Sequence, residues 1–119
     1  MCIRDSYPPN DGAPELLDAI GGWLTRRFGF STVPEQILAL NGTREGIYNT
    51  CMALCHEEKN GQRPVVLTPN PFYQVYAVAA LSVGAEPVYV NATAESGHLP
   101  DFAALDGDLL DRTAVAYIC

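Results

Sequence analysis

The stretch that decides the fold is residues 38–49, LALNGTREGIYN. Its apolar start belongs to a run over residues 37–40, which is too short for a membrane span and suits a strand covered on both faces. The run breaks into a turn that contains Gly42. We therefore expect a buried strand that ends in this turn.

A helix is predicted to begin directly after the turn and to run over residues 43–57. Thr43 is placed to cap it. Its apolar positions recur at helical spacing, as Ile47, Cys51, Leu54 and Cys55. The first N–H groups of a helix have no partner inside it, and the positive end of the helix dipole lies at the same place. This arrangement suits an anion such as phosphate.

Composition excludes several classes of function. The chain has 119 residues, enough for one domain, and a formal net charge of −7 with only seven Lys and Arg residues, so it offers no basic surface for nucleic acid. No apolar run approaches the ~20 residues that cross a bilayer, and the first residues lack the apolar core of a signal peptide. We expect a cytoplasmic protein without membrane or nucleic-acid partners.

Helical and strand patterns alternate along the chain, which predicts an α/β fold. It is a three-layer arrangement, with a mostly parallel sheet and helices on both of its faces. The expected helices are residues 13–28, 43–57, 72–83 and a short one near 99–105; the expected strands are residues 37–40, 64–68, 87–90 and 114–118. Ligands of such sheets gather at the carboxyl ends of the strands. The turns at residues 41–45 and 69–73 should therefore lie close together.

Other groups of reactive side chains have simpler interpretations. Cys51, Cys55 and His56 lack a second pair of zinc ligands, so the cysteines are interpreted as core thiols. Glu95 and His98 lie in a hydrophilic loop without a neighbouring nucleophile. The aspartates lack the spacing of a calcium loop and are interpreted as solvated residues around a short helix, and no metal site is expected; they are Asp101, Asp106, Asp108 and Asp111.

Three phrases, in this order, resemble the front part of the class I/II aminotransferases that use pyridoxal phosphate. They are YPPNDGAPELLDAI, LNGTREGIYN and TPNPFYQVYAVAALSVGAEPVYV, and the likeness runs from Tyr7 to Cys119. Within the family, the wording is most similar to bacterial succinyldiaminopimelate aminotransferases of lysine biosynthesis. The resemblance implies a partial large domain of this fold and transamination between an amino acid and a 2-oxo acid.

The resemblance also implies roles for particular residues. Gly42, Thr43 and Arg44 match the turn that holds the phosphate of pyridoxal phosphate. Tyr73 matches a ring that lies against the pyridine of the cofactor, whereas Phe72 is expected to pack inward and Tyr76 to pack within its helix. Tyr7 matches a tyrosine that reaches the cofactor of the partner subunit in a homodimer.

The chain also departs from the family pattern. Lys59, its only lysine, lies in a polar turn and is interpreted as a solvated loop residue, so the lysine that binds the cofactor covalently is absent. We expect residues 1–6 to lie outside the fold and residues 7–119 to be an N-terminal fragment of the cofactor-binding domain, inactive alone. Two alternatives remain: an aminotransferase-like sensor domain of a transcription regulator, and a related carbon–sulfur lyase.

Overall fold

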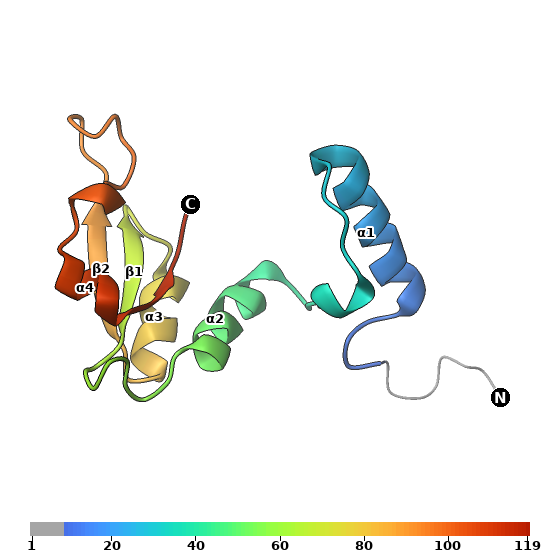
Figure 1. The fold of residues 1–119 in the computed structure, drawn as a ribbon, viewed down its shortest axis with the longest axis horizontal. Helices are drawn as coiled ribbons and strands as arrows, with labels where there is room; N and C mark the ends of the chain where they lie inside the picture. The colour runs from blue at the N-terminus through green and yellow to red at the C-terminus, as the bar shows by residue number, and fades with distance from the viewer. Residues whose placement is uncertain (1–8) are drawn as a thin grey trace. The chain divides into compact units, whose positions relative to one another are not determined.

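The computed structural model describes residues 9–119, which divide into two compact units. The first ends at Asn41, and the second runs from Gly42 to Cys119. The first unit contains α1 (Pro14–Phe28) and the short 3-10 helix η1 (Pro34–Gln36) (Figure 1). The second contains the sheet and the other helices.

Helix α1 forms where the sequence predicts it. Pro14 is its first residue, and it ends at Gly29, whose φ of 78° lets its N–H bond the carbonyl of Thr25 at 3.0 Å. A Cβ on Gly21 would lie 3.1 Å from Thr32 Oγ1, so this glycine permits a close approach. The apolar residues of α1 are buried only in part: Leu17 is buried, whereas Leu16, Trp23 and Phe28 are exposed.

The strand expected at residues 37–40 does not form, so this prediction was wrong. A strand needs a neighbour for its N–H and C=O groups. Within the described residues, this segment forms isolated backbone bonds instead of a ladder: Ile37 N–H bonds Pro34 O in a turn, and Ala39 N–H bonds the distant Asp11 O at 3.4 Å. Leu38 is 64% exposed. The apolar character of residues 37–40 was therefore not enough to predict a strand in a sheet.

The second unit is built on a parallel sheet of three strands, in the order β2-β1-β3. They are β1 (Val65–Asn70), β2 (Glu86–Asn91) and β3 (Thr113–Ala116). Both β2 and β3 pair with β1 in parallel, with Leu67 opposite Val88 on one side and Ala116 on the other. Three of the four expected strands are therefore confirmed, with ends shifted by one or two residues.

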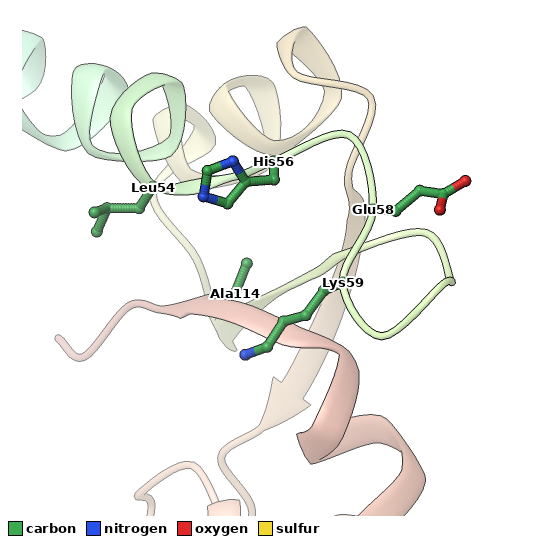
Figure 2. Close-up of a pocket in the computed structure, with 5 residues that line it drawn as sticks. All are labelled: Leu54, His56, Glu58, Lys59 and Ala114. Carbon is green, nitrogen blue, oxygen red and sulfur yellow. The ribbon is translucent and has the colours of Figure 1, made fainter.

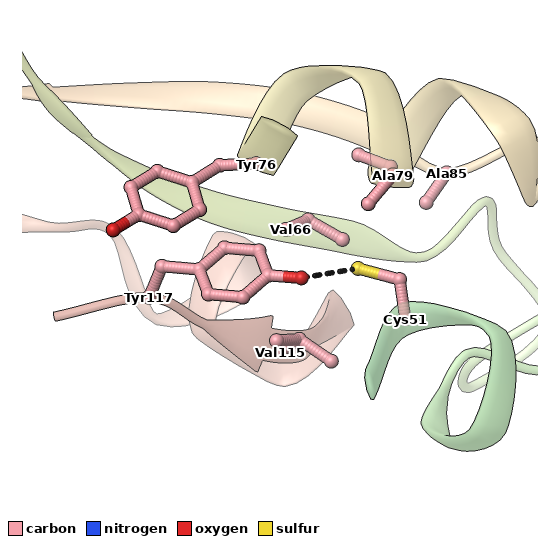
Figure 3. Packing of buried hydrophobic residues seen from close by; sticks show 8 residues of the cluster. Cys51, Val66, Tyr76, Ala79, Ala85, Val115 and Tyr117 are labelled. Carbon is pink, nitrogen blue, oxygen red and sulfur yellow. Dashed lines mark hydrogen bonds between the residues drawn. The ribbon is translucent and has the colours of Figure 1, made fainter. Parts of the chain in front are cut away.

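Helices cover both faces of β1, which confirms the three-layer α/β fold (Figure 1). On one face, α2 (Thr43–Leu54) and α3 (Gln74–Ser82) pack with Val66 in the cluster drawn in Figure 3. On the other face, Val65 and Leu67 pack against η2 (Phe102–Ala104) and residues that include Leu109 of α4 (Gly107–Arg112). The alternation of side chains along β1 separates the two clusters.

Two of the aspartates discussed above cap these short helices. Asp101 accepts hydrogen bonds from the N–H groups of Ala103 and Ala104, and Asp106 accepts one from Asp108 N–H. Carboxylates at helix starts satisfy free donors. The interpretation of these aspartates as exposed residues around a short helix is confirmed, whereas α4 lies beyond the helix expected near residues 99–105 and was not predicted.

Candidate functional site

The candidate site begins at Gly42, the residue that precedes α2. Gly42 has φ 150° and ψ 153°, a conformation that is essentially restricted to glycine. Gly42 occupies the cap position itself, and Thr43 is the first helical residue without a side-chain capping bond. The prediction that Thr43 caps the helix was therefore wrong, because a cap must lie outside helical geometry.

The first turn of α2 presents unused backbone donors. Within residues 9–119, no acceptor bonds the N–H groups of Thr43, Arg44 and Glu45, and the first bonded amide is Gly46 N–H, which donates to Gly42 O at 3.3 Å. These three residues are exposed. Free amides at the positive end of a twelve-residue helix form an electropositive spot.

Tyr73 lies beside this turn. It precedes α3 and follows the carboxyl end of β1, and its side chain is 39% exposed. Arg44 Nε donates a hydrogen bond of 2.7 Å to the Tyr73 hydroxyl, and the guanidinium carbon lies 5.5 Å from the centre of the ring. The two loops that the sequence placed at one edge of the sheet therefore do lie together.

The two aromatic neighbours of Tyr73 differ from one another in burial. Phe72 is 44% exposed and packs on Tyr89, with 4.9 Å between ring centres, so the expectation that it packs inward was wrong. Tyr76 is buried in the core cluster, which confirms its packing role. Because Phe72 and Tyr73 both precede α3, the helical period could not assign their directions.

A buried network behind the site was not foreseen from the sequence. Tyr117, just after β3, donates a hydrogen bond of 2.7 Å to Ile47 O of α2, and its hydroxyl lies 3.0 Å from Cys51 Sγ (Figure 3). Burial, followed by the nearby Cys51, raises the pKa of Tyr117. The network ties the second turn of α2 to the sheet. The alternation of Val115 and Tyr117 along the last apolar run was the only signal for it.

These groups fit a phosphorylated, flat cofactor. Three free amides and the exposed Thr43 hydroxyl are donors that suit a phosphate. The partly exposed ring of Tyr73 offers a surface for stacking on a heterocycle. Tyr7, the remaining residue of the predicted site, lies outside the described residues.

Lys59 lies at the opposite end of the sheet. It lines a cavity of about 180 Å³ with Leu54, His56, Glu58 and Ala114 (Figure 2). Its Nζ donates to the carbonyl of Thr113, the first residue of β3, so the interpretation as a solvated loop lysine was wrong. Tyr73 instead follows the carboxyl end of β1, and six strand residues span roughly 17–20 Å. Lys59 therefore cannot reach a cofactor held on Tyr73.

The remaining reactive groups do not assemble into a second centre. Among the described residues, no three His, Cys, Asp or Glu side chains are grouped so that they could hold a metal ion. Cys51 is fully buried and Cys55 partly buried, in agreement with their interpretation as core thiols. Glu95 and His98 are exposed. In the same part of the chain, no helix has the length and apolar character needed to cross a membrane.

Comparison with known families decides the identity of the fold. The family model described as aminotransferase class I and II matches residues 3–119. The chain belongs to this family. Members of the aminotransferase class I and II family depend on pyridoxal phosphate, the phosphorylated flat cofactor that fits the groups around α2 and Tyr73.

Curated relatives narrow the comparison further. An LL-diaminopimelate aminotransferase of Dehalococcoides mccartyi is 35% identical over 113 residues, which are 94% of this chain and 28% of that protein. One from Desulforudis audaxviator is also 35% identical, with the same coverage. The chain thus spans about 28% of the length of these relatives. Their name corrects the subfamily suggested by the sequence, because these relatives are LL-diaminopimelate aminotransferases and not succinyldiaminopimelate aminotransferases.

Solved aminotransferases share the fold. A crystal structure of an aminotransferase from Neisseria meningitidis matches with a TM-score of 0.85 and 32% identity, over 97% of this chain and 29% of that one. Substrate-bound BacF from Bacillus subtilis matches with a TM-score of 0.83 and 27% identity, over 95% of this chain and 28% of that one. The chain therefore has part of the fold of these larger aminotransferases.

Proposed function

We propose that the chain is an N-terminal part of the cofactor-binding domain of an aminotransferase that moves an amino group between an amino acid and a 2-oxo acid. One observation carries the proposal. The free amides of α2 and the ring of Tyr73 lie together at the carboxyl end of β1, in a family that depends on pyridoxal phosphate. Since the chain spans about 28% of its relatives, the complete activity belongs to a longer protein.

Each residue has a role in this proposal. The N–H groups of Thr43 and Arg44, with the Thr43 hydroxyl, hold the phosphate, and Gly42 gives the turn the shape that exposes them. The Tyr73 ring stacks on the pyridine of the cofactor. When bound, the cofactor supplies an electron sink for the amino acid. Tyr7 would reach the cofactor of a second subunit in a homodimer.

The substrate class follows from the relatives. Their printed name supports LL-diaminopimelate as the amino acid, which would connect the protein with lysine biosynthesis, and it replaces the succinylated substrate suggested by the sequence. The covalent anchor of the cofactor is a lysine outside this chain in our proposal. Lys59 takes no part, because it lies at the amino end of the strands.

The test uses a longer protein that contains this chain and the rest of an aminotransferase. We expect visible absorbance from bound pyridoxal phosphate and transfer of an amino group from LL-diaminopimelate to a 2-oxo acid. Tyr73→Ala should weaken cofactor binding by about 2- to 10-fold, on the scale of one lost aromatic contact. Lys59→Arg is the matched control and should leave the absorbance unchanged. A longer protein that binds no pyridoxal phosphate would refute the proposal.

A further inference from the structure

We infer that the side chain of Arg44 is a positioning group for the ring of Tyr73 and not a partner of the phosphate. The inference rests on the proposed function, which assigns the phosphate to backbone amides of the same turn. Arg44 would then have two roles. Its backbone N–H donates to the anion site, and its guanidinium holds the Tyr73 ring in place.

The contacts of Arg44 are directed at Tyr73. Nε donates to the Tyr73 hydroxyl at 2.7 Å, a charge-assisted hydrogen bond of short length. The guanidinium carbon is 5.5 Å from the ring centre, within the range of a favourable cation–π contact. Within residues 9–119, no carboxylate forms a salt bridge with Arg44, so Tyr73 is the group that holds its side chain.

The inner edge of the Tyr73 ring has a separate support. It meets Tyr76 edge-on, with ring centres 5.8 Å apart and planes at 86°. Tyr76 in turn stacks on Tyr117 at 4.4 Å, and the Tyr117 hydroxyl bonds Ile47 O of α2. The ring is therefore fixed from the core by Tyr76 and from the solvent side by Arg44.

Removal of the Arg44 guanidinium would take away its hydrogen bond and its ring contact with Tyr73. A side chain that is 39% exposed regains rotamer freedom once its hydroxyl and ring face lose their contacts. The ring would then have to be ordered again before it could stack on a heterocycle. Arg44 should thus affect the binding of the ring part of the cofactor, whereas amides that belong to the helix should continue to bind phosphate.

The first test needs no ligand. In the 119-residue chain with labelled tyrosines, Tyr73→Phe identifies the ring signals of Tyr73 by nuclear magnetic resonance. We expect Arg44→Met, which keeps the length of the side chain, to move these ring signals while those of the buried Tyr117 keep their positions, showing that the core is folded. Unmoved Tyr73 signals would overturn the inference.

The second test divides the cofactor into its parts. Pyridoxal, which lacks the phosphate, should bind Arg44→Met and Tyr73→Phe about 3- to 10-fold more weakly than the original chain, the effect of one hydrogen bond. The double variant should be no weaker than either single one, because both remove the same interaction. Inorganic phosphate should bind all four chains within about twofold at physiological salt.

The outcomes separate this inference from the proposed function. If Arg44→Met weakens phosphate binding while Tyr73→Phe does not, Arg44 pairs with the phosphate and the inference is wrong. If the original chain binds neither probe, the assigned cofactor site fails, and the ligand-free signals of Tyr73 still decide whether Arg44 positions the ring.

Discussion

Gly42 is the residue on which the geometry of the site depends most. Its φ of 150° and ψ of 153° lie where side chains are strained, although a Cβ would meet no atom within 4 Å. We predict that Gly42→Ala lowers the free energy of unfolding by about 1–3 kcal/mol or shifts the turn. In either case it should weaken phosphate binding. Urea unfolding and phosphate titration check this.

A second glycine provides the control for Gly42. Gly107 begins α4, also has open space for a Cβ and has no positive φ. Gly107→Ala should change the free energy of unfolding by no more than about 0.5 kcal/mol. Equal effects of the two substitutions would show that alanine adopts the backbone conformation of Gly42 without strain.

Thr68 carries a buried hydroxyl whose effect on the free energy of unfolding can be measured. The residue is fully buried in β1, and Oγ1 has no hydrogen-bond partner among the described residues. We predict that Thr68→Val raises the free energy of unfolding by about 1 kcal/mol, because an unpaired polar group leaves the core. Thr50→Val is the control, since Thr50 Oγ1 donates to Gly46 O at 2.8 Å and its loss should not stabilise. A destabilised Thr68→Val would indicate a partner for Oγ1.

Cys55 gives the stability of the chain a dependence on pH. Burial, and then the neighbouring Cys51, raises the pKa of its thiol from 9.0 to about 11. An acid with a raised pKa in the folded state stabilises fully below its unfolded pKa and loses that contribution as pH rises through the folded value. Stability should therefore fall between about pH 9 and pH 11. Urea midpoints at both ends of this range should fall more for the original chain than for Cys55→Ala, and equal falls would contradict the shift.

Helix α2 begins with the turn that we propose for phosphate binding, and Tyr117, directly after β3, fixes this helix. We predict that Tyr117→Phe destabilises the chain by about 1–2 kcal/mol, because its hydroxyl loses the bond to Ile47 O and the contact with Cys51 Sγ. Amide hydrogen exchange in α2 should become faster at the same time. Tyr89→Phe removes a hydroxyl from a ring that is 45% exposed and should change neither quantity. An effect of Tyr89→Phe as large as that of Tyr117→Phe would argue against the anchor.

Most elements could be predicted from local signals. The helix over Pro14–Phe28 has a proline at its start and a glycine after its end, and β1 is an apolar run between turns. The run at residues 37–40 has the same apolar character, yet no strand pairs with it in the described part of the chain. Pairing depends on distant residues, so side-chain pattern alone could not decide it.

The site could be predicted only in outline. The turns at residues 41–45 and 69–73 were expected to lie together, and Arg44 and Tyr73 do, although within the described residues only the second turn follows a strand. The hydrogen bond between them, the capping role of Gly42 and the bond from Tyr117 to α2 depend on side-chain and backbone angles. Such angles have no period in the sequence.

At the scale of the whole molecule, the candidate cofactor site and Lys59 lie at opposite ends of the sheet. The carboxyl end of β1 leads to Tyr73 and the free amides of α2, whereas the amino end of β3 meets Lys59. The chain spans about 28% of the length of the LL-diaminopimelate aminotransferases that it matches, so in our proposal it contributes binding groups and not the whole activity. Cofactor binding is therefore the part of the proposal that can be tested on the chain itself.

The most direct test is a titration of the 119-residue chain with pyridoxal phosphate, followed by nuclear magnetic resonance of backbone amides and tyrosine rings. We predict that the amides of Thr43, Arg44 and Glu45 and the ring of Tyr73 change together, with one common affinity. Changes confined to the cavity beside Lys59, or no change at the start of α2, would contradict the assignment of the cofactor site.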